Sequence, residues 1–171
     1  MALLQTTIDN DAKARASKVF ARNGLTFGKD SNMIKILFLC HGNICRSPMA
    51  EFIMKDLVKK EGRSAEFEID SKALTTEEIG NDMYPPAKRC LDGHNVSYTA
   101  RKARQFQASD YNKFDHIYIM NRENKGLIDR IVKGDKIEFL NGEIDDPWYT
   151  GDFEKSYTQI KEGCQRILAE L

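Results

Sequence analysis

The stretch from residue 34 to residue 60 constrains the fold more than any other part of the chain. It begins with an apolar run, Ile-Lys-Ile-Leu-Phe-Leu, which predicts a buried strand that ends at Cys40. Ser47 and Pro48 then give the start signal of a helix, with Ser47 as the N-cap and Pro48 in the first turn. The apolar residues that follow lie at helical spacing: Met49, Phe52, Ile53 and Leu57. The sequence therefore predicts a strand, a short loop and a helix in direct succession.

The connection between this strand and this helix has the composition of an anion-binding loop. A helix N-terminus presents unpaired N–H groups, and a glycine-containing loop can wrap further backbone amides around an oxyanion. Arg46 adds a planar donor fork that binds phosphate bidentately. Cys40 faces the same amides, which favours a thiolate nucleophile below a bound phosphate. The predicted phosphate-binding loop after Cys40 comprises His41, Gly42, Asn43, Ile44, Cys45, Arg46 and Ser47, with Asn43 suited to a left-handed backbone conformation.

The rest of the chain alternates strand signals with helix signals. Further strands are predicted at residues 66–70, 115–120 and 137–140, and helices at residues 84–93, 122–132 and from 153 onward. This alternation is typical of the α/β class, here a single-domain, doubly wound four-stranded parallel sheet flanked by helices, Rossmann-like in layout. Such sheets bind ligands at the carboxyl ends of their strands, which is where Cys40 is expected.

Composition and charge exclude several kinds of partner. Basic and acidic residues balance at 26 each, which gives no sign of a surface for nucleic acid or membrane. The sequence has no apolar run of membrane-spanning length and no signal-type segment, so a cytoplasmic location is expected. The spacing of the cysteines and histidines does not match that of metal ligands; these residues are Cys40, Cys45, Cys90, Cys164, His41, His94 and His116. We therefore expect the cysteines to be free thiols, and we expect neither a metal nor a cofactor.

Several segments match the pattern of one enzyme family. They are Cys-x5-Arg-Ser-Pro directly after the first strand, Ile69-Asp70-Ser71, Arg101-Lys102-Ala103-Arg104-Gln105, Phe114-Asp115-His116-Ile117 and Asp145-Asp146-Pro147-Trp148-Tyr149. On these motifs, residues 33–171 resemble the low-molecular-weight protein tyrosine phosphatases of the bacterial type. The resemblance implies hydrolysis of phosphotyrosine in proteins, or of small aryl phosphates, with inorganic phosphate as the product.

The resemblance also implies roles for individual residues. Cys40 would form a cysteinyl-phosphate, Arg46 would bind the phosphoryl group, and Asp146 would protonate the leaving tyrosine oxygen as general acid. Ser47 would donate to the Cys40 sulfur, and Asp145 would raise the pKa of Asp146 by like-charge repulsion. Aromatic residues would wall the cleft for the phenyl ring: Trp148 and Tyr149.

The chain departs from the family pattern near the loop. Asn121 stands where many members carry an Asp that pairs with the loop arginine, and Arg101 stands where a His often orients the loop Asn. Glu77 and Glu78 occupy the place of an aromatic second wall in some members. These differences affect the charge balance and the peptide preference, and they leave the nucleophile, the arginine and the acid in place.

Three other functions remain open at this point. A protein-arginine phosphatase shares the fold and loop but carries Thr where this chain has Ile44, which favours phosphotyrosine. An arsenate reductase needs resolving cysteines, for which only Cys90 is a distant candidate. A non-catalytic phosphate-binding module would not need the full set of nucleophile, arginine and acid. Cys45 either traps an oxidised Cys40 as a disulfide or simply packs as a small apolar residue.

Residues 1–32 differ from the rest of the chain. Their mixed charges and small residues predict an N-terminal extension with a short helix near residues 11–22. Because the nucleophile of the resembled family lies near the chain start, the phosphatase domain is expected to span residues 33–171. The extension is expected to be dispensable for catalysis.

Overall fold

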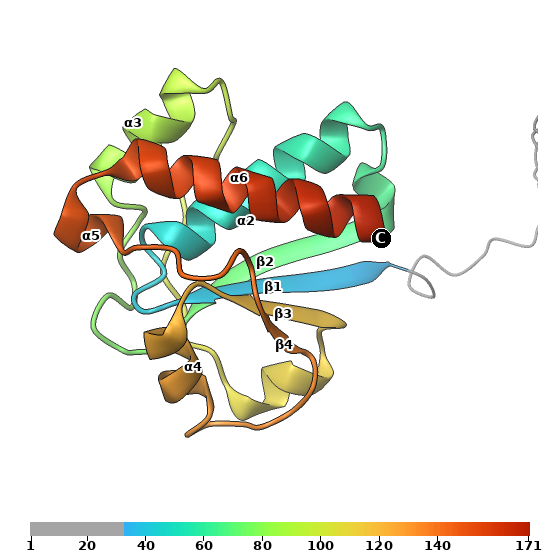
Figure 1. The fold of residues 1–171 in the computed structure, drawn as a ribbon, viewed down its shortest axis with the longest axis vertical. Coiled ribbons are helices and arrows are strands. Elements are labelled where there is room, and N and C mark those ends of the chain that lie inside the picture. The colour runs from blue at the N-terminus through green and yellow to red at the C-terminus, as the bar shows by residue number, and fades with distance from the viewer. Residues whose placement is uncertain (1–32) are drawn as a thin grey trace, which may run out of the picture. The chain divides into compact units, whose positions relative to one another are not determined.

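The computed structural model describes residues 33–171, and the predictions made for residues 1–32 lie outside the described residues. A four-stranded sheet forms the centre of this part, in the order β2-β1-β3-β4 (Figure 1). Its strands are β1 (Ile34–Cys40), β2 (Phe67–Ala73), β3 (His116–Ile119) and β4 (Ile137–Phe139). All three pairings are parallel, so the predicted α/β parallel sheet is confirmed.

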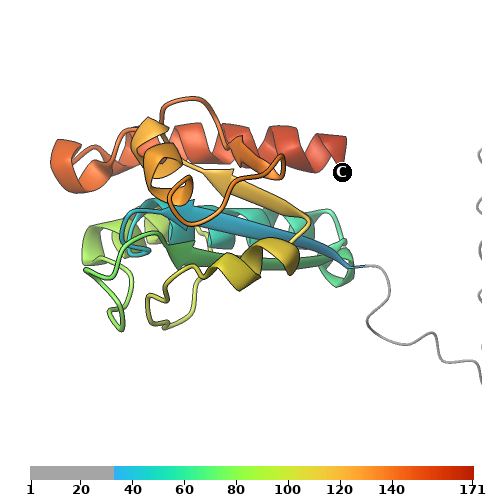
Figure 2. The same cartoon turned by 90° about the horizontal axis from the view of Figure 1, so that it is seen from below.

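Helices cover both faces of the sheet. The helices are α2 (Arg46–Lys60), α3 (Pro85–Gly93), α4 (Arg122–Ile128), α5 (Pro147–Thr150) and α6 (Phe153–Glu170). Figure 1 places α2, α3 and α6 on one side of the sheet and α4 on the other, and Figure 2 views the α4 side. A 3-10 helix, Ala108–Asn112, lies on the same face of the sheet as α4. Another 3-10 helix, Ser64–Glu66, precedes β2.

The alternation of side chains along β1 divides the core into two layers. Ile36 and Phe38 pack with residues of α2, α3 and α6, whereas Leu37 and Leu39 pack with Phe106, Phe114 and Ile128 on the other face. Successive residues of a strand point to opposite faces, so a central strand buried on both sides needs a continuous apolar run. The first strand signal in the sequence reflects this double burial.

Three expected boundaries are wrong. Helix α2 begins at Arg46 with Cys45 at the N-cap position and no side-chain cap, so Ser47 is not the N-cap. The Ser47 hydroxyl is instead occupied by Cys40 and Asn43. Strand β2 continues to Ala73, past the predicted end at residue 70, and α4 ends at Ile128 instead of residue 132.

None of the helices within residues 33–171 combines the length and the apolar character that crossing a membrane requires.

Candidate active site

A pocket lies at the carboxyl end of β1, as expected for a doubly wound sheet. Strand β1 delivers Cys40 to its floor, and the loop that follows leads into the N-terminus of α2. The lining brings together residues from three stretches of the chain: Cys40, His41, Gly42, Ile44, Cys45, Arg46, Glu77, Glu78, Asp146, Trp148 and Tyr149. The predicted nucleophile, arginine, acid and aromatic residues therefore line one pocket.

Hydrogen-bond donors surround the Cys40 sulfur. The backbone N–H of Asn43 points at Sγ over 3.3 Å, and the Ser47 Oγ lies 3.0 Å from Sγ. Because Ser47 Oγ already accepts a bond of 2.8 Å from Asn43 Nδ2, its own hydrogen is available to the sulfur. Both contacts stabilise negative charge on Cys40, whether in the attacking thiolate or in the thiolate that leaves.

Asn43 shapes the loop through its backbone. Its φ of 60° is left-handed, as expected from the sequence. The side chain is fully buried and bonds on both of its ends, with Nδ2 donating to Ser47 and Ser71 and Oδ1 accepting from Arg101. The loop conformation is therefore fixed in part by contacts with Ser71 and Arg101, which lie outside the loop.

Arg101 reaches the loop from a distant segment. It donates to the Asn43 carbonyl oxygen at 3.1 Å and to Asn43 Oδ1 at 2.9 Å. Ser71 donates to the buried carboxylate of Glu51 at 2.5 Å, and the guanidinium of Arg101 lies 3.8 Å from that carboxylate. Arg101 therefore orients the loop asparagine itself, although the sequence suggested only that a usual partner was replaced. Its side chain, Ser71 and Glu51 form a support that sequence reasoning missed.

Arg46 is almost completely buried, with 1% of its surface exposed. One terminal nitrogen donates to the Ile144 carbonyl oxygen at 3.0 Å, and the other donates to Asp146 Oδ2 at 3.1 Å. These bonds tie the phosphate-binding loop to the segment that carries the predicted acid. Asn121 has a separate task, because its side chain caps α4 by accepting from the Asn124 N–H.

Asp146 and Asp145 face different partners. Asp146 is the N-cap of α5, where Oδ1 accepts from the Trp148 N–H at 3.0 Å while Oδ2 faces Arg46. Asp145 turns away to Lys155, with 2.9 Å between Oδ2 and Nζ, and this bond raises the pKa of Lys155. The charge that was expected to act on Asp146 is therefore paired with a lysine on α6.

The aromatic residues form one side of the pocket. Trp148 packs against Tyr84 with 4.7 Å between ring centroids, and Tyr84 in turn lies 6.1 Å from the ring of Phe153. Trp148 is half exposed and Tyr149 is largely exposed, so both present ring surface to a ligand. Such faces suit a flat aryl group.

Acidic side chains surround His41 at the pocket. The ring nitrogens of His41 bond Glu77 and Glu123, each at 2.8 Å. Burial lowers the pKa of His41, but the two carboxylates outweigh it, so the pKa is raised above its usual value. Glu77 and Glu78 line the pocket beside this histidine.

Cys45 lies in the pocket lining as a buried free thiol. Burial, helped by the nearby Cys40, raises its pKa far above the usual range, so Cys45 is not a second nucleophile at neutral pH. Both expected roles, a disulfide with an oxidised Cys40 and packing as a small apolar residue, stay predictions.

Comparisons with known proteins agree with this geometry. Residues 35–171 match the sequence model of the family described as low molecular weight phosphotyrosine protein phosphatase. The low molecular weight protein-tyrosine-phosphatase YfkJ of Bacillus subtilis is 36% identical over 151 residues, which cover 81% of this chain and 96% of that protein. The low molecular weight phosphotyrosine protein phosphatase of Sus scrofa is 36% identical over 152 residues, covering 80% and 94%.

Solved structures give the same result. The crystal structure of YfkJ superposes with a TM-score of 0.79 at 35% identity, covering 82% of this chain and 96% of that one. A Drosophila arginine phosphatase superposes with a TM-score of 0.71 at 30% identity, covering 80% and 97%. With the family match over most of its length and two relatives above 30% identity, the chain belongs to the low-molecular-weight protein tyrosine phosphatase family.

Proposed function

We propose that this phosphatase hydrolyses phosphotyrosine through a cysteinyl-phosphate at Cys40, with Asp146 as the general acid. The observation that carries the proposal is the convergence of the Cys40 sulfur, the Arg46 guanidinium and the Asp146 carboxylate on one pocket with an aromatic side. Phosphotyrosine-containing proteins or small aryl phosphates are the proposed substrates, and inorganic phosphate is the product. The cytoplasmic location stays a prediction.

The first step transfers the phosphoryl group to the enzyme. The Cys40 thiolate attacks phosphorus, a sulfur–phosphorus bond forms, and the bond from phosphorus to the tyrosine oxygen breaks. The electron pair goes to the phenolic oxygen, which takes the proton of the Asp146 carboxyl group. A phosphate that takes over the donor fork of Arg46 also releases Asp146 from its ion pair with that side chain.

The second step releases phosphate. Water attacks phosphorus and gives its proton to the Asp146 carboxylate, and the sulfur–phosphorus bond breaks. The electron pair returns to Cys40, where the Ser47 hydroxyl and the Asn43 N–H stabilise the leaving thiolate. The backbone amides and Arg46 hold the equatorial oxygens through both displacements.

Exchange of the acid tests this mechanism. In Asp146→Ala, hydrolysis of phosphotyrosine is expected to fall by about 10²- to 10⁴-fold, because the departing phenolate has a conjugate-acid pKa near ~10. A nitrophenyl phosphate, whose leaving group needs little protonation, is expected to lose clearly less. Rates of phosphocysteine formation with a series of aryl phosphates measure this leaving-group dependence.

Asp145→Ala is the matched control for the acid. Its carboxylate contacts Lys155 on α6, so the change leaves protonation of the leaving group possible and the leaving-group dependence shallow. A steep dependence in Asp145→Ala together with a shallow one in Asp146→Ala would move the acid one position earlier. Cys40→Ser completes the set, since it removes turnover and keeps the phosphate-binding amides.

A second candidate substrate is phosphoarginine, favoured by the similarity to an arginine phosphatase structure. Against it stands Ile44, an apolar side chain in the pocket lining, because the family resemblance leads us to expect Thr at this position in an arginine phosphatase. Parallel kcat/KM measurements with phosphotyrosine, phosphoarginine and arsenate on one purified sample separate the two phosphatases and the reductase. Phosphotyrosine is expected to be the best substrate, and a higher kcat/KM for phosphoarginine would overturn the choice.

A further inference from the structure

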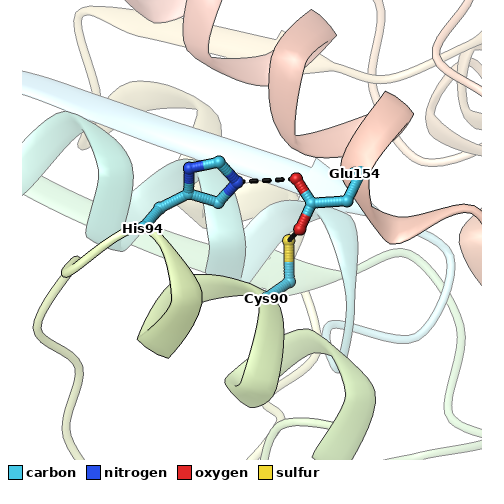
Figure 3. A group of neighbouring side chains, drawn as sticks. All are labelled: Cys90, His94 and Glu154. Atoms are coloured by element: carbon cyan, nitrogen blue, oxygen red, sulfur yellow. Dashed lines mark hydrogen bonds and ion pairs between the residues drawn. The ribbon is translucent and has the colours of Figure 1, made fainter.

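A group of three ligand-type side chains lies outside the active site. Cys90 lies in α3 and His94 directly follows the end of this helix, four positions later; Glu154 in the first turn of α6 faces both (Figure 3). Glu154 Oε2 lies 2.6 Å from His94 Nε2, and Glu154 Oε1 lies 3.5 Å from Cys90 Sγ. The three ligand atoms all lie within 4.8 Å of one another.

We propose that Cys90, His94 and Glu154 bind a divalent cation of the zinc class, at a site distinct from the phosphatase pocket. Thiolate sulfur, imidazole nitrogen and carboxylate oxygen are the ligand atoms that Zn²⁺ takes in proteins, at about 2.3, 2.0–2.1 and 2.0–2.2 Å. A soft thiolate disfavours Mg²⁺ and Ca²⁺, which prefer oxygen ligands only. Glu154 has an exposed side chain, so a rotation of its carboxylate would let it share one ion with His94 Nε2 and Cys90 Sγ.

The environment of Cys90 supports a cation. Cys90 is buried, and its thiol hydrogen-bonds two acceptors, the Glu154 carboxylate and the Phe153 carbonyl oxygen at 3.6 Å. A bound divalent ion supplies the positive charge that a thiolate needs here, and the thiol proton passes to solvent.

The position of His94 is fixed before any ion binds. Its ring stacks on Tyr157 with 3.7 Å between centroids and 7° between planes, and this stack directs Nε2 toward Glu154. As a ligand the imidazole is neutral, with its Nε2 lone pair on the ion and its proton on Nδ1. The side chain of Glu154 is 67% exposed, so water reaches the fourth position of a tetrahedral site.

An ion at this place would connect α3 to the start of α6. Phe153, which precedes Glu154, packs against Tyr84, and Tyr84 precedes α3 and packs against Trp148 of the pocket side. The bound ion therefore stabilises the frame behind the aromatic residues without touching Cys40. A cation that binds the native state alone raises the melting temperature in proportion to the logarithm of its concentration.

This site has no signal in the linear sequence. Two of the ligands are close in the chain, but Glu154 is separated from His94 by 60 positions, and only the packing of α6 on α3 brings them together. A cation bound here would differ from the expectation, based on residue spacing, that the chain holds no metal.

The test uses Zn²⁺ and Co²⁺ on metal-free protein in the Cys40→Ser background, which removes the catalytic thiolate as a competing ligand. Calorimetric titration is expected to show one Zn²⁺ per chain, and Co²⁺ is expected to give a thiolate-to-metal charge-transfer band. Affinity should fall by about tenfold or more in each of Cys90→Ser, His94→Gln and Glu154→Gln, because each removes one of three ligands. The increase in melting temperature that Zn²⁺ causes should become smaller in the same variants.

Two matched controls accompany these variants. Glu162→Gln removes another exposed carboxylate from α6, and His116→Gln removes another histidine, and both should bind Zn²⁺ as the Cys40→Ser protein does. Should Cys90→Ser prove unstable by circular dichroism, His94→Gln at the partly exposed end decides the matter. The proposal is overturned if the Cys40→Ser protein binds no Zn²⁺, or if binding is unchanged in His94→Gln.

Discussion

Asn43 is the residue on which the geometry of the phosphate-binding loop depends. A residue other than glycine in the left-handed region costs about 1–2 kcal/mol, so the surroundings have to hold it there. Arg101 does this with two hydrogen bonds, to the backbone oxygen and to the side-chain oxygen of Asn43. Through Asn43 it also sets the position of Ser47, and with it the donors around the Cys40 sulfur.

Arg101 does not line the pocket, but its replacement should lower activity through the loss of its bonds to Asn43. In Arg101→Ala, kcat/KM is expected to fall by about tenfold, and inorganic phosphate should inhibit more weakly, because Asn43 loses both bonds and the amides lose their alignment. Arg101→His, which restores a donor, should recover part of the loss. Lys102→Ala, the exposed neighbour, is the control and should behave as wild type. Equal losses in Arg101→Ala and Lys102→Ala would remove Arg101 from this role.

At the scale of elements, α6 passes so close to the end of β4 that Gly163 has no room for a side chain. A Cβ at this position would lie 2.7 Å from the carbonyl oxygen of Leu140 and 2.9 Å from its Cδ1. The backbone oxygen cannot rotate away, so the helix would have to shift. We expect Gly163→Ala to lower the free energy of unfolding by about 1–3 kcal/mol, measured by urea denaturation.

Gly126 in α4 supplies the opposite case. It is exposed, and a Cβ there meets nothing within 4 Å. Gly126→Ala is therefore expected to raise the free energy of unfolding by about 0.5–1 kcal/mol, since alanine has the better helix propensity. If both glycine variants were stabilised alike, the close approach of α6 to Leu140 would not exist in solution.

His41 links the phosphate-binding loop to two other segments of the chain through its bonds to Glu77 and Glu123. Its ring lies between Glu77 and Glu123, which raise its pKa above the ordinary value of about 6.5 despite partial burial. A raised folded-state pKa gives stability that is complete below about pH 6.5 and is lost as the pH rises through the folded value. The difference in free energy of unfolding between wild type and His41→Gln should therefore be largest near pH ~6 and shrink above neutrality.

Titration of the His41 ring by NMR can show which carboxylates raise its pKa. Glu77→Gln is expected to lower the pKa of His41, because one of two ion pairs is lost. Glu78→Gln, whose carboxylate accepts from Asn81 Nδ2 instead, should change it less. A larger drop in Glu78→Gln than in Glu77→Gln would contradict the contacts.

At the scale of the whole molecule, the features that could be predicted from the sequence are those formed by residues close together in the chain. The apolar run of β1, the loop and the helix that follows are contiguous, so their composition predicted them and the carboxyl-end position of Cys40. The contacts that depend on strand order could not be predicted in this way. Arg101 and Asn43 are 58 positions apart, and Glu51 and Ser71 are 20 apart.

The same reason explains the wrong boundaries. Ser47 has the chemistry of an N-cap, but its hydroxyl hydrogen-bonds Cys40 and Asn43 instead. Helix α2 therefore begins at Arg46, one residue before Ser47. Strand β2 extends past residue 70 because its last residues keep pairing with β1 as far as Cys40, although the buried Ser71 is polar and gives no strand signal. Local propensity gives way where the active site needs the side chain elsewhere.

The last prediction concerns how much of the molecule the chemistry requires. The family match covers residues 35–171, and every residue of the pocket lining lies within them. A chain of residues 33–171 is therefore expected to fold and to keep kcat within about twofold of the full chain, measured with the same aryl phosphate. A chain shortened to begin at Leu37 is the control, because it lacks the part of β1 that pairs with Phe67–Ile69 and should not fold stably. A folded 33–171 chain with a large loss of kcat would show that residues 1–32 take part in catalysis, since the sheet, the loop and the acid would all be intact.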